Sequence, residues 1–155
     1  MDSMVEIYLD RANNEILAAE ILKTLSEKSK QEFNMPQNTT FYSSVISHAY
    51  YAIFYSAKAI LLTKSIKTSS PNIHNKTFEA FKHTFIDTGI LDVKLLNIYK
   101  NISIRADELL EIFRYEKSKR GNFTYKTIPQ ANKSPAEDSL NNAKFFVSNI
   151  KKVIK

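Results

Sequence analysis

Cysteine is absent from this 155-residue chain, and glycine and proline are scarce, with two and four residues respectively. Without cysteine, the protein can form no disulfide framework, no thiolate nucleophile and no cysteine-ligated metal site. Few glycines and prolines leave few turns, so we expect long elements, which means helices. Two glycines also cannot make a glycine-rich phosphate-binding loop.

Long hydrophobic runs are missing too. No stretch reaches the roughly 18 continuous apolar residues of a membrane span, and the start, MDSMVEIYLDRANNE, does not resemble a signal peptide. We therefore expect a cytoplasmic protein without a membrane partner. The composition, 43% hydrophobic and 25% charged, is ordinary for a globular fold, and the length fits one domain over residues 1–155. The net charge of +6 favours an anionic partner, nucleic acid or nucleotide first.

Apolar residues recur at spacings of three and four along most of the chain, as in amphipathic helices. The predicted helices cover residues 4–30, 41–64, 75–87, 92–118 and 135–153. This pattern predicts an all-α fold, an up-and-down four-helix bundle core with a fifth short helix. The second helix is the most apolar, and its alanines, including Ala49 and Ala52, would let another helix approach closely.

Local signals also predict where these helices begin and end. Thr39 or Thr40 could cap the second helix, and Asp92 the fourth. Gly89 is placed to end the short helix. Ser134 is followed by a proline and, three residues after the serine, by a glutamate, which predicts the start of the last helix.

Four segments carry a resemblance to a known family. They are 8-YLDRANNEILAAEILKTL-25, 47-SHAYYAIFYSAKAIL-61, 71-PNIHNKTFEAF-81 and 134-SPAEDSLNNAKFFVSNI-150. In this order they resemble HEPN domains, small helical domains found beside minimal nucleotidyltransferases in bacteria and archaea. The resemblance covers nearly the whole chain. It implies a homodimer with its long helices paired across a two-fold axis, and a nucleotidyltransferase as partner protein.

The basic stretch 117-KSKRGNFTYK-126 follows the predicted long helix. Arg120 and Tyr125 resemble the R-x-x-A-D-Y motif of a HEPN subgroup, although Thr124 stands where that motif has Asp. HEPN ribonucleases carry R-x(4–6)-H at this place, with the two residues meeting across a dimer cleft. Here Tyr125 takes the place of the histidine, and no His follows Arg120.

The chemistry of this pair favours binding over cleavage. The guanidinium of Arg120 is permanently charged and suits phosphate, whereas tyrosine, with a pKa near 10, is a poor base at neutral pH. If the protein is an enzyme, Arg120 and Tyr125 are the candidate catalytic residues. In the alternative, Tyr125 packs against the bundle while Arg120 is solvated or caps the helix.

A polar and aromatic stripe runs along the second helix through Ser44, His48, Tyr51, Tyr55 and Lys58. His48 stands where HEPN domains often have Arg. Such a stripe could line a cleft and stack a base. Tyrosine is also favoured at interfaces, because it has an apolar body and a polar tip. We favour the rim of a helix–helix or subunit interface for this stripe.

The remaining histidines have weaker signals. His74 precedes the short helix in a loop, where anions can bind or where the residue is simply a cap or solvated. His83 lies between phenylalanines and is expected to be half-exposed and structural. No two histidines have the spacing of a helical metal-binding pair, so we expect neither a metal nor a cofactor.

Three functions follow in order of preference. The first is a homodimeric module, either nucleotide- or RNA-binding or of the toxin–antitoxin type, that works with a minimal nucleotidyltransferase. The second is a metal-independent ribonuclease, with His48 or His74 replacing the missing histidine, and the third is a purely structural dimer. The candidate binding residues are Lys119, Arg120, Asn122, Tyr125, His48, Tyr51, Tyr55 and His74.

Overall fold

The structure is a computed structural model. It describes the backbone of residues 2–28, 30–119 and 132–154, and the side chains of these ranges apart from residues 111–119. Every regular element in these ranges is helical. The elements are α1 (Ser3–Glu27), η1 (Gln31–Phe33), α2 (Tyr42–Leu62), α3 (Ile73–Phe81), η2 (Lys82–Ile86), α4 (Val93–Lys119) and α5 (Lys133–Ile154). The predicted all-α class is confirmed.

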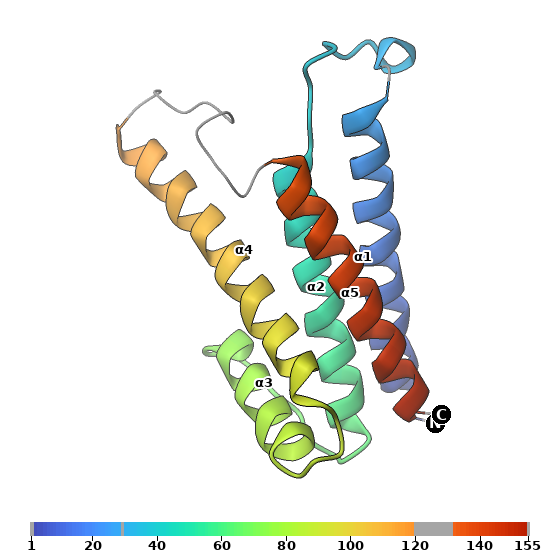
Figure 1. Ribbon diagram of the computed structural model, residues 1–155. Coiled ribbons are helices and arrows are strands. Elements are labelled where there is room, and N and C mark those ends of the chain that lie inside the picture. The colour runs from blue at the N-terminus through green and yellow to red at the C-terminus, as the bar shows by residue number, and fades with distance from the viewer. Residues whose placement is uncertain (1, 29, 120–131, 155) are drawn as a thin grey trace.

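Four long helices, α1, α2, α4 and α5, alternate in direction along one bundle (Figure 1). The short α3 lies beside the first turns of α4, and the start of α1 and the end of α5 lie at the same end of the bundle (Figure 1). The predicted arrangement, four helices with a short fifth, is therefore confirmed. The second half of the predicted 75–87 helix is wound differently, because η2 is a π-helical turn.

Helix α2 is the central element and packs against α1, α3, α4 and α5. Its alanines Ala49, Ala52, Ala57 and Ala59 are fully buried, as are Ala12 and Ala19 on α1. Small side chains allow two helix backbones to approach, and α1 and α2 form the most extensive contact between the described helices. By length and composition α2 could also cross a membrane, and 61% of its apolar stretch is buried inside the bundle.

Two of the predicted helix ends are confirmed. The side chain of Asp92 accepts a hydrogen bond from the backbone N–H of Lys94 at 2.7 Å, which caps the start of α4. Gly89 follows the short helix with a φ of +78°, a left-handed conformation that glycine adopts without strain.

The other two predicted caps are wrong. Helix α2 starts after Phe41 without a side-chain cap, so neither Thr39 nor Thr40 has this role. Helix α5 begins at Lys133, which places Ser134 inside its first turn rather than before it.

Two residues near the end of α1 hold the connection to α2 instead. The hydroxyl of Ser26 accepts a hydrogen bond from the backbone N–H of Phe41 at 2.7 Å. The buried Lys30 ammonium donates to the carbonyls of Ser26 at 2.9 Å and Gln37 at 2.8 Å. A buried ammonium needs such acceptors, and these two bring the connection back over α1.

Candidate functional site

Part of the predicted site lies outside the described residues. Arg120, Asn122 and Tyr125 belong to the segment 120–131. Lys119 is the last residue of α4, and its side chain is also outside the described set. The proposed phosphate-binding role of this segment therefore stays a prediction.

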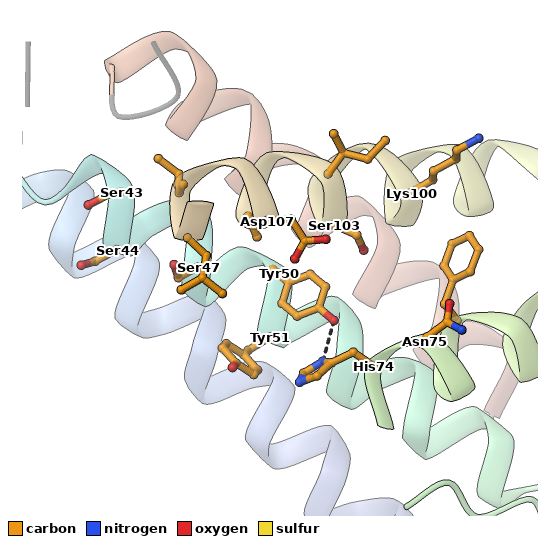
Figure 2. A pocket seen from close by; sticks show the side chains of 15 residues that line it. Ser43, Ser44, Ser47, Tyr50, Tyr51, His74, Asn75, Lys100, Ser103 and Asp107 are labelled. Atoms are coloured by element: carbon orange, nitrogen blue, oxygen red, sulfur yellow. Dashed lines mark hydrogen bonds between the residues drawn. The ribbon is translucent and has the colours of Figure 1, made fainter. Parts of the chain in front are cut away.

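The described residues do form a cavity of about 640 Å³ between α2, α3 and α4. Figure 2 shows His74 and Asn75 of α3 facing Tyr50 and Tyr51 of α2, with Ser103 and Asp107 of α4 on the far wall. The volume lies in the range of small-molecule sites. The lining residues are Ser43, Ser44, Ser47, Tyr50, Tyr51, His74, Asn75, Phe78, Lys100, Ser103, Ile104, Ala106, Asp107, Leu109 and Leu110.

A hydrogen-bonded connection before α3 brings His74 to this cavity. Thr68 and Thr77 share a hydrogen bond of 2.6 Å between their hydroxyls, which ties the connection to α3. Lys58 of α2 donates to the carbonyl of Thr68 at 3.1 Å and so ties it to α2. His74 consequently lies in the first turn of α3, not in a loop as its sequence context suggested.

His74 meets Tyr50 in the cavity wall, with 2.7 Å between the imidazole Nδ1 and the phenol oxygen. Burial lowers the pKa of His74, although the residue still reaches solvent. Burial raises the pKa of Tyr50 well above its ordinary value. Both shifts favour the neutral forms, and the tautomer of the imidazole decides which of the two groups donates the hydrogen bond.

Aromatic rings surround this pair. The His74 ring lies 4.6 Å from the ring of Phe54 and 6.0 Å from that of Tyr51. Phe54 is buried, whereas Tyr51 keeps 38% of its surface exposed. One wall of the cavity therefore offers exposed aromatic surface, and the polar groups of Ser103, Asp107 and Asn75 face it (Figure 2). A planar heterocycle with donors and acceptors at its edge is the ligand that such walls suit.

The residues of the predicted stripe on α2 do not share one surface in the structure, because some line the cavity and others contact α1. Ser44 and Tyr51 line the cavity. His48 turns to α1, where its Nδ1 lies 2.5 Å from a carboxylate oxygen of Glu15. Tyr55 likewise packs on α1, stacked on Tyr8 with ring centres 6.1 Å apart. His48 and His74 are therefore not brought together in one site.

His83 lies away from the cavity lining, in η2. Its side chain is 64% exposed and contacts Glu79 and Asp87, one turn before and one turn after it. The residue is thus more exposed than its sequence position suggested, and its contacts are local.

Sequence reasoning missed Tyr50 and the polar wall of α4. Tyr50 lies on the apolar face of the second helix, between Ala49 and Ala52, but its hydroxyl reaches His74. Lys100, Ser103 and Asp107 follow each other at helical spacing on α4, between the apolar residues Tyr99, Ile102 and Ala106. That polar interruption of an apolar face is the signal that could have revealed this wall.

Comparison with known proteins identifies the family. Residues 5–153 match the HEPN domain. Two proteins of Methanocaldococcus jannaschii are similar in sequence. One, named "Putative toxin MJ0142", is 32% identical over 129 residues, which is 83% of this chain and 76% of that protein. The other, "Putative toxin MJ0605", is 32% identical over 114 residues, 74% of this chain and 72% of that protein. No solved structure matches.

The match spans all five helices and includes the α3 segment that carries His74. The resemblance seen in the four motifs is therefore confirmed along the length of the chain: the protein belongs to the HEPN domain family.

Proposed function

We propose that this HEPN domain is the toxin-like component of a toxin–antitoxin pair, and that it binds RNA or a nucleotide in the cavity between α2, α3 and α4. The cavity itself carries the proposal, since it combines an exposed aromatic wall with a neutral histidine–tyrosine pair. The names of the two similar proteins support the toxin-like role.

The charges around the cavity suggest how a nucleotide would lie. Asp107 repels phosphate but accepts hydrogen bonds from the amino and imino groups of a base. Lys100 lies two turns before Asp107 on α4, at the opposite side of Ser103 (Figure 2). We place the base between Tyr51 and Asp107 and the phosphate toward Lys100.

Binding of a labelled single-stranded RNA tests this function. Each phosphate contact releases counterions, so affinity should fall steeply between 50 and 200 mM salt. His74→Ala and Tyr51→Ala should each weaken binding about tenfold, because they remove the aromatic wall. His83→Ala is the matched control, since it removes an exposed histidine outside the cavity. Equal affinity at both salt concentrations, or equal effects of the two histidine variants, would contradict the proposal.

A metal-independent ribonuclease is the second candidate, and the geometry of His74 supports it. Cleavage through the 2′-hydroxyl needs a base that is neutral at working pH, and the lowered pKa of His74 satisfies this condition. Arg120 would neutralise the phosphate. Purified protein should then cleave total RNA, and both His74→Ala and Arg120→Ala should abolish the cleavage. If the protein does not cleave RNA, or if the variants cleave it unchanged, the ribonuclease function is excluded and the binding function remains.

The HEPN resemblance also supports a homodimer and a nucleotidyltransferase partner. Light scattering of the purified protein gives the mass in solution and tests the dimer. Co-expression with a nucleotidyltransferase encoded next to this gene, followed by purification through a tag on one protein, tests the partner. A monomer that binds no RNA and no such protein would contradict both.

A further inference from the structure

A second group of aromatic rings lies on the surface between α1 and α2. The rings of Tyr8 on α1 and Tyr55 on α2 are nearly parallel, with 17° between their planes and 6.1 Å between their centres. A cation from the opposite helix lies over the face of each ring. The Arg11 guanidinium lies 5.2 Å above Tyr55, and the Lys58 ammonium lies 5.1 Å above Tyr8.

This group is continuous with the cavity through Tyr51. The ring of Tyr51 lies 6.1 Å from that of Tyr55 and 6.0 Å from that of His74. Tyr51 and His74 line the cavity, whereas Tyr8 and Tyr55 do not. Four rings, His74, Tyr51, Tyr55 and Tyr8, therefore form a row that begins in the cavity and leaves it across α2 toward α1. We call it the ring row.

The charges along the ring row are positive. Arg11 is exposed, and neither Arg11 nor Lys58 forms an ion pair with a carboxylate of the described residues. Glu15, one turn after Arg11, is engaged by His48. Tyr51 is exposed, and Tyr8 and Tyr55 are partly exposed. Such rings beside cations that form no ion pair make a surface suited to bases and phosphates, because every base has a face that stacks on an aromatic ring.

We propose that the ring row binds single-stranded RNA that extends from the cavity: one base enters the cavity, and the next nucleotides lie along Tyr51, Tyr55 and Tyr8 with their phosphates near Arg11 and Lys58. This inference rests on the proposed function and adds the substrate class to it. Bases of a duplex are already stacked and paired, so a duplex cannot use the row. Unpaired RNA of several nucleotides is the substrate that it fits.

The length of the RNA ligand distinguishes binding along the ring row from binding in the cavity alone. We would titrate the protein with adenosine monophosphate and with oligoadenylates of two, four and eight nucleotides. Affinity of the unaltered protein should rise with length. Tyr55→Leu should lower the affinity for the longer oligoadenylates about tenfold, because it removes one stacking ring. It should leave the affinity for adenosine monophosphate unchanged. Tyr55→Phe keeps the ring and should restore the affinity.

Arg11→Gln gives a second variant that does not depend on packing, since Arg11 is exposed. It should weaken binding of the oligonucleotides and reduce their salt dependence by about one counterion. Lys152→Gln, an exposed lysine on α5, is the control and should change neither. Circular dichroism of each variant shows whether the helices are retained.

The outcomes distinguish the two proposals. Monophosphate binding without any gain in affinity with length overturns the ring row and leaves the cavity function standing. Absence of binding to every RNA overturns the proposed function and the ring row together. Duplex RNA that binds as tightly as single strands, or Leu and Phe variants of Tyr55 that behave alike, overturns the ring row. So does conversion of a dimer to a monomer by Tyr55→Leu, because the row would then be a subunit interface.

Discussion

The two sides of α2 are packed in opposite ways. Toward α1, small residues such as Ala12 and Ala19 are fully buried and the helices are in contact along their length. Toward α4, the contact is less extensive and a cavity of about 640 Å³ remains. Figure 1 shows α4 leaning away from α2 and α5 along its course. One side stabilises the fold, and the other leaves space for a ligand.

The residue types explain the difference. On the α1 side, the fully buried part of the contact presents alanine and branched aliphatic side chains, and the polar pair of His48 and Glu15 lies at its partly exposed edge. The α4 side presents Ser103, Asp107 and the hydroxyl of Tyr50, which keep hydrogen-bonding capacity that a dry core could not satisfy. The cavity therefore depends on the polar wall of α4, and the same kind of substitution should have a different effect on each side of α2.

The largest expected effect comes from the sealed part of the core. Phe146 of α5 is fully buried, and its ring meets those of Phe81 and Tyr99 at 5.4 and 5.8 Å. Phe146→Ala should lower the free energy of unfolding by about 3–5 kcal/mol, because it leaves a closed void. Urea denaturation followed by circular dichroism measures the loss.

Phe78→Ala is the matched variant on the open side. Phe78 already borders the cavity, so its removal enlarges a space that solvent reaches. We expect a clearly smaller loss of stability than for Phe146→Ala. Equal losses for the two variants would show that the cavity wall is packed as tightly as the core, and the comparison would fail.

An alanine that is enlarged on each side tests the same contrast in the opposite direction. Ala12 on α1 has no exposed surface, so Ala12→Leu should force α1 from α2 and cost about 1–3 kcal/mol. Ala106 on α4 lines the cavity, and Ala106→Leu should change the stability by less than about 0.5 kcal/mol while filling space that a ligand needs. Thermal unfolding and RNA titration of both variants measure these effects.

Two results would count against this contrast. Ala106→Leu could destabilise the protein as strongly as Ala12→Leu, which would mean that the wall of α4 has no spare room. It could also bind RNA as well as the unaltered protein, which would place the ligand elsewhere.

The contrast also shows what the sequence could predict. The spacing of apolar residues was sufficient for all five helices, and the alanines of α2 correctly predicted a close helix neighbour. His74 and Tyr51, both proposed as binding residues, do line one cavity. His48 and Tyr55 belong to the same sequence stripe but turn to α1. Helical periodicity places residues on a face, but it does not say which neighbouring helix covers each part of that face.

The cavity itself could not be predicted. Its volume depends on the angle between α2 and α4 and on the placement of α3 through Thr68 and Thr77, which are contacts between segments distant in sequence. The capping pattern at Ser134 failed for a related reason. Lys133 already belongs to α5, and the carbonyl of Asn132 accepts a hydrogen bond from the N–H of Ala136, so the helix starts earlier than the local signal indicates.

Arg105 connects α4 to α5, and its substitution should have the next largest effect on stability. Its Nη1 donates to the hydroxyl of Ser139 at 2.7 Å and to the carbonyl of Pro135 at 3.1 Å, both on α5. Arg105→Met should cost about 1 kcal/mol in urea denaturation, because these hydrogen bonds are lost. Lys144→Met removes an exposed ion pair with Glu20 and is the control, with a loss below about 0.5 kcal/mol. Equal losses would mean that the bridge does not hold α4.

The smallest expected effect is a pH dependence on the open side. Burial lowers the pKa of His74 below its ordinary value of about 6.5. The unfolded chain therefore binds the proton first, so this residue's contribution to stability is present above about pH 6.5 and is lost as the pH falls through the folded-state pKa. Titration of the histidine resonances by NMR gives that pKa directly.

Two exposed variants change the pKa of His74 in opposite directions. Tyr51→Ala removes a neighbouring ring and exposes the imidazole, so the pKa should rise toward its ordinary value. Asp107→Asn removes the negative charge that partly opposes the effect of burial, so the pKa should fall further. If the pKa of His74 responds to neither variant, then the wall of α4 has no electrostatic influence on His74. The open side of α2 would then be a loosely packed surface and not a site with its own electrostatics.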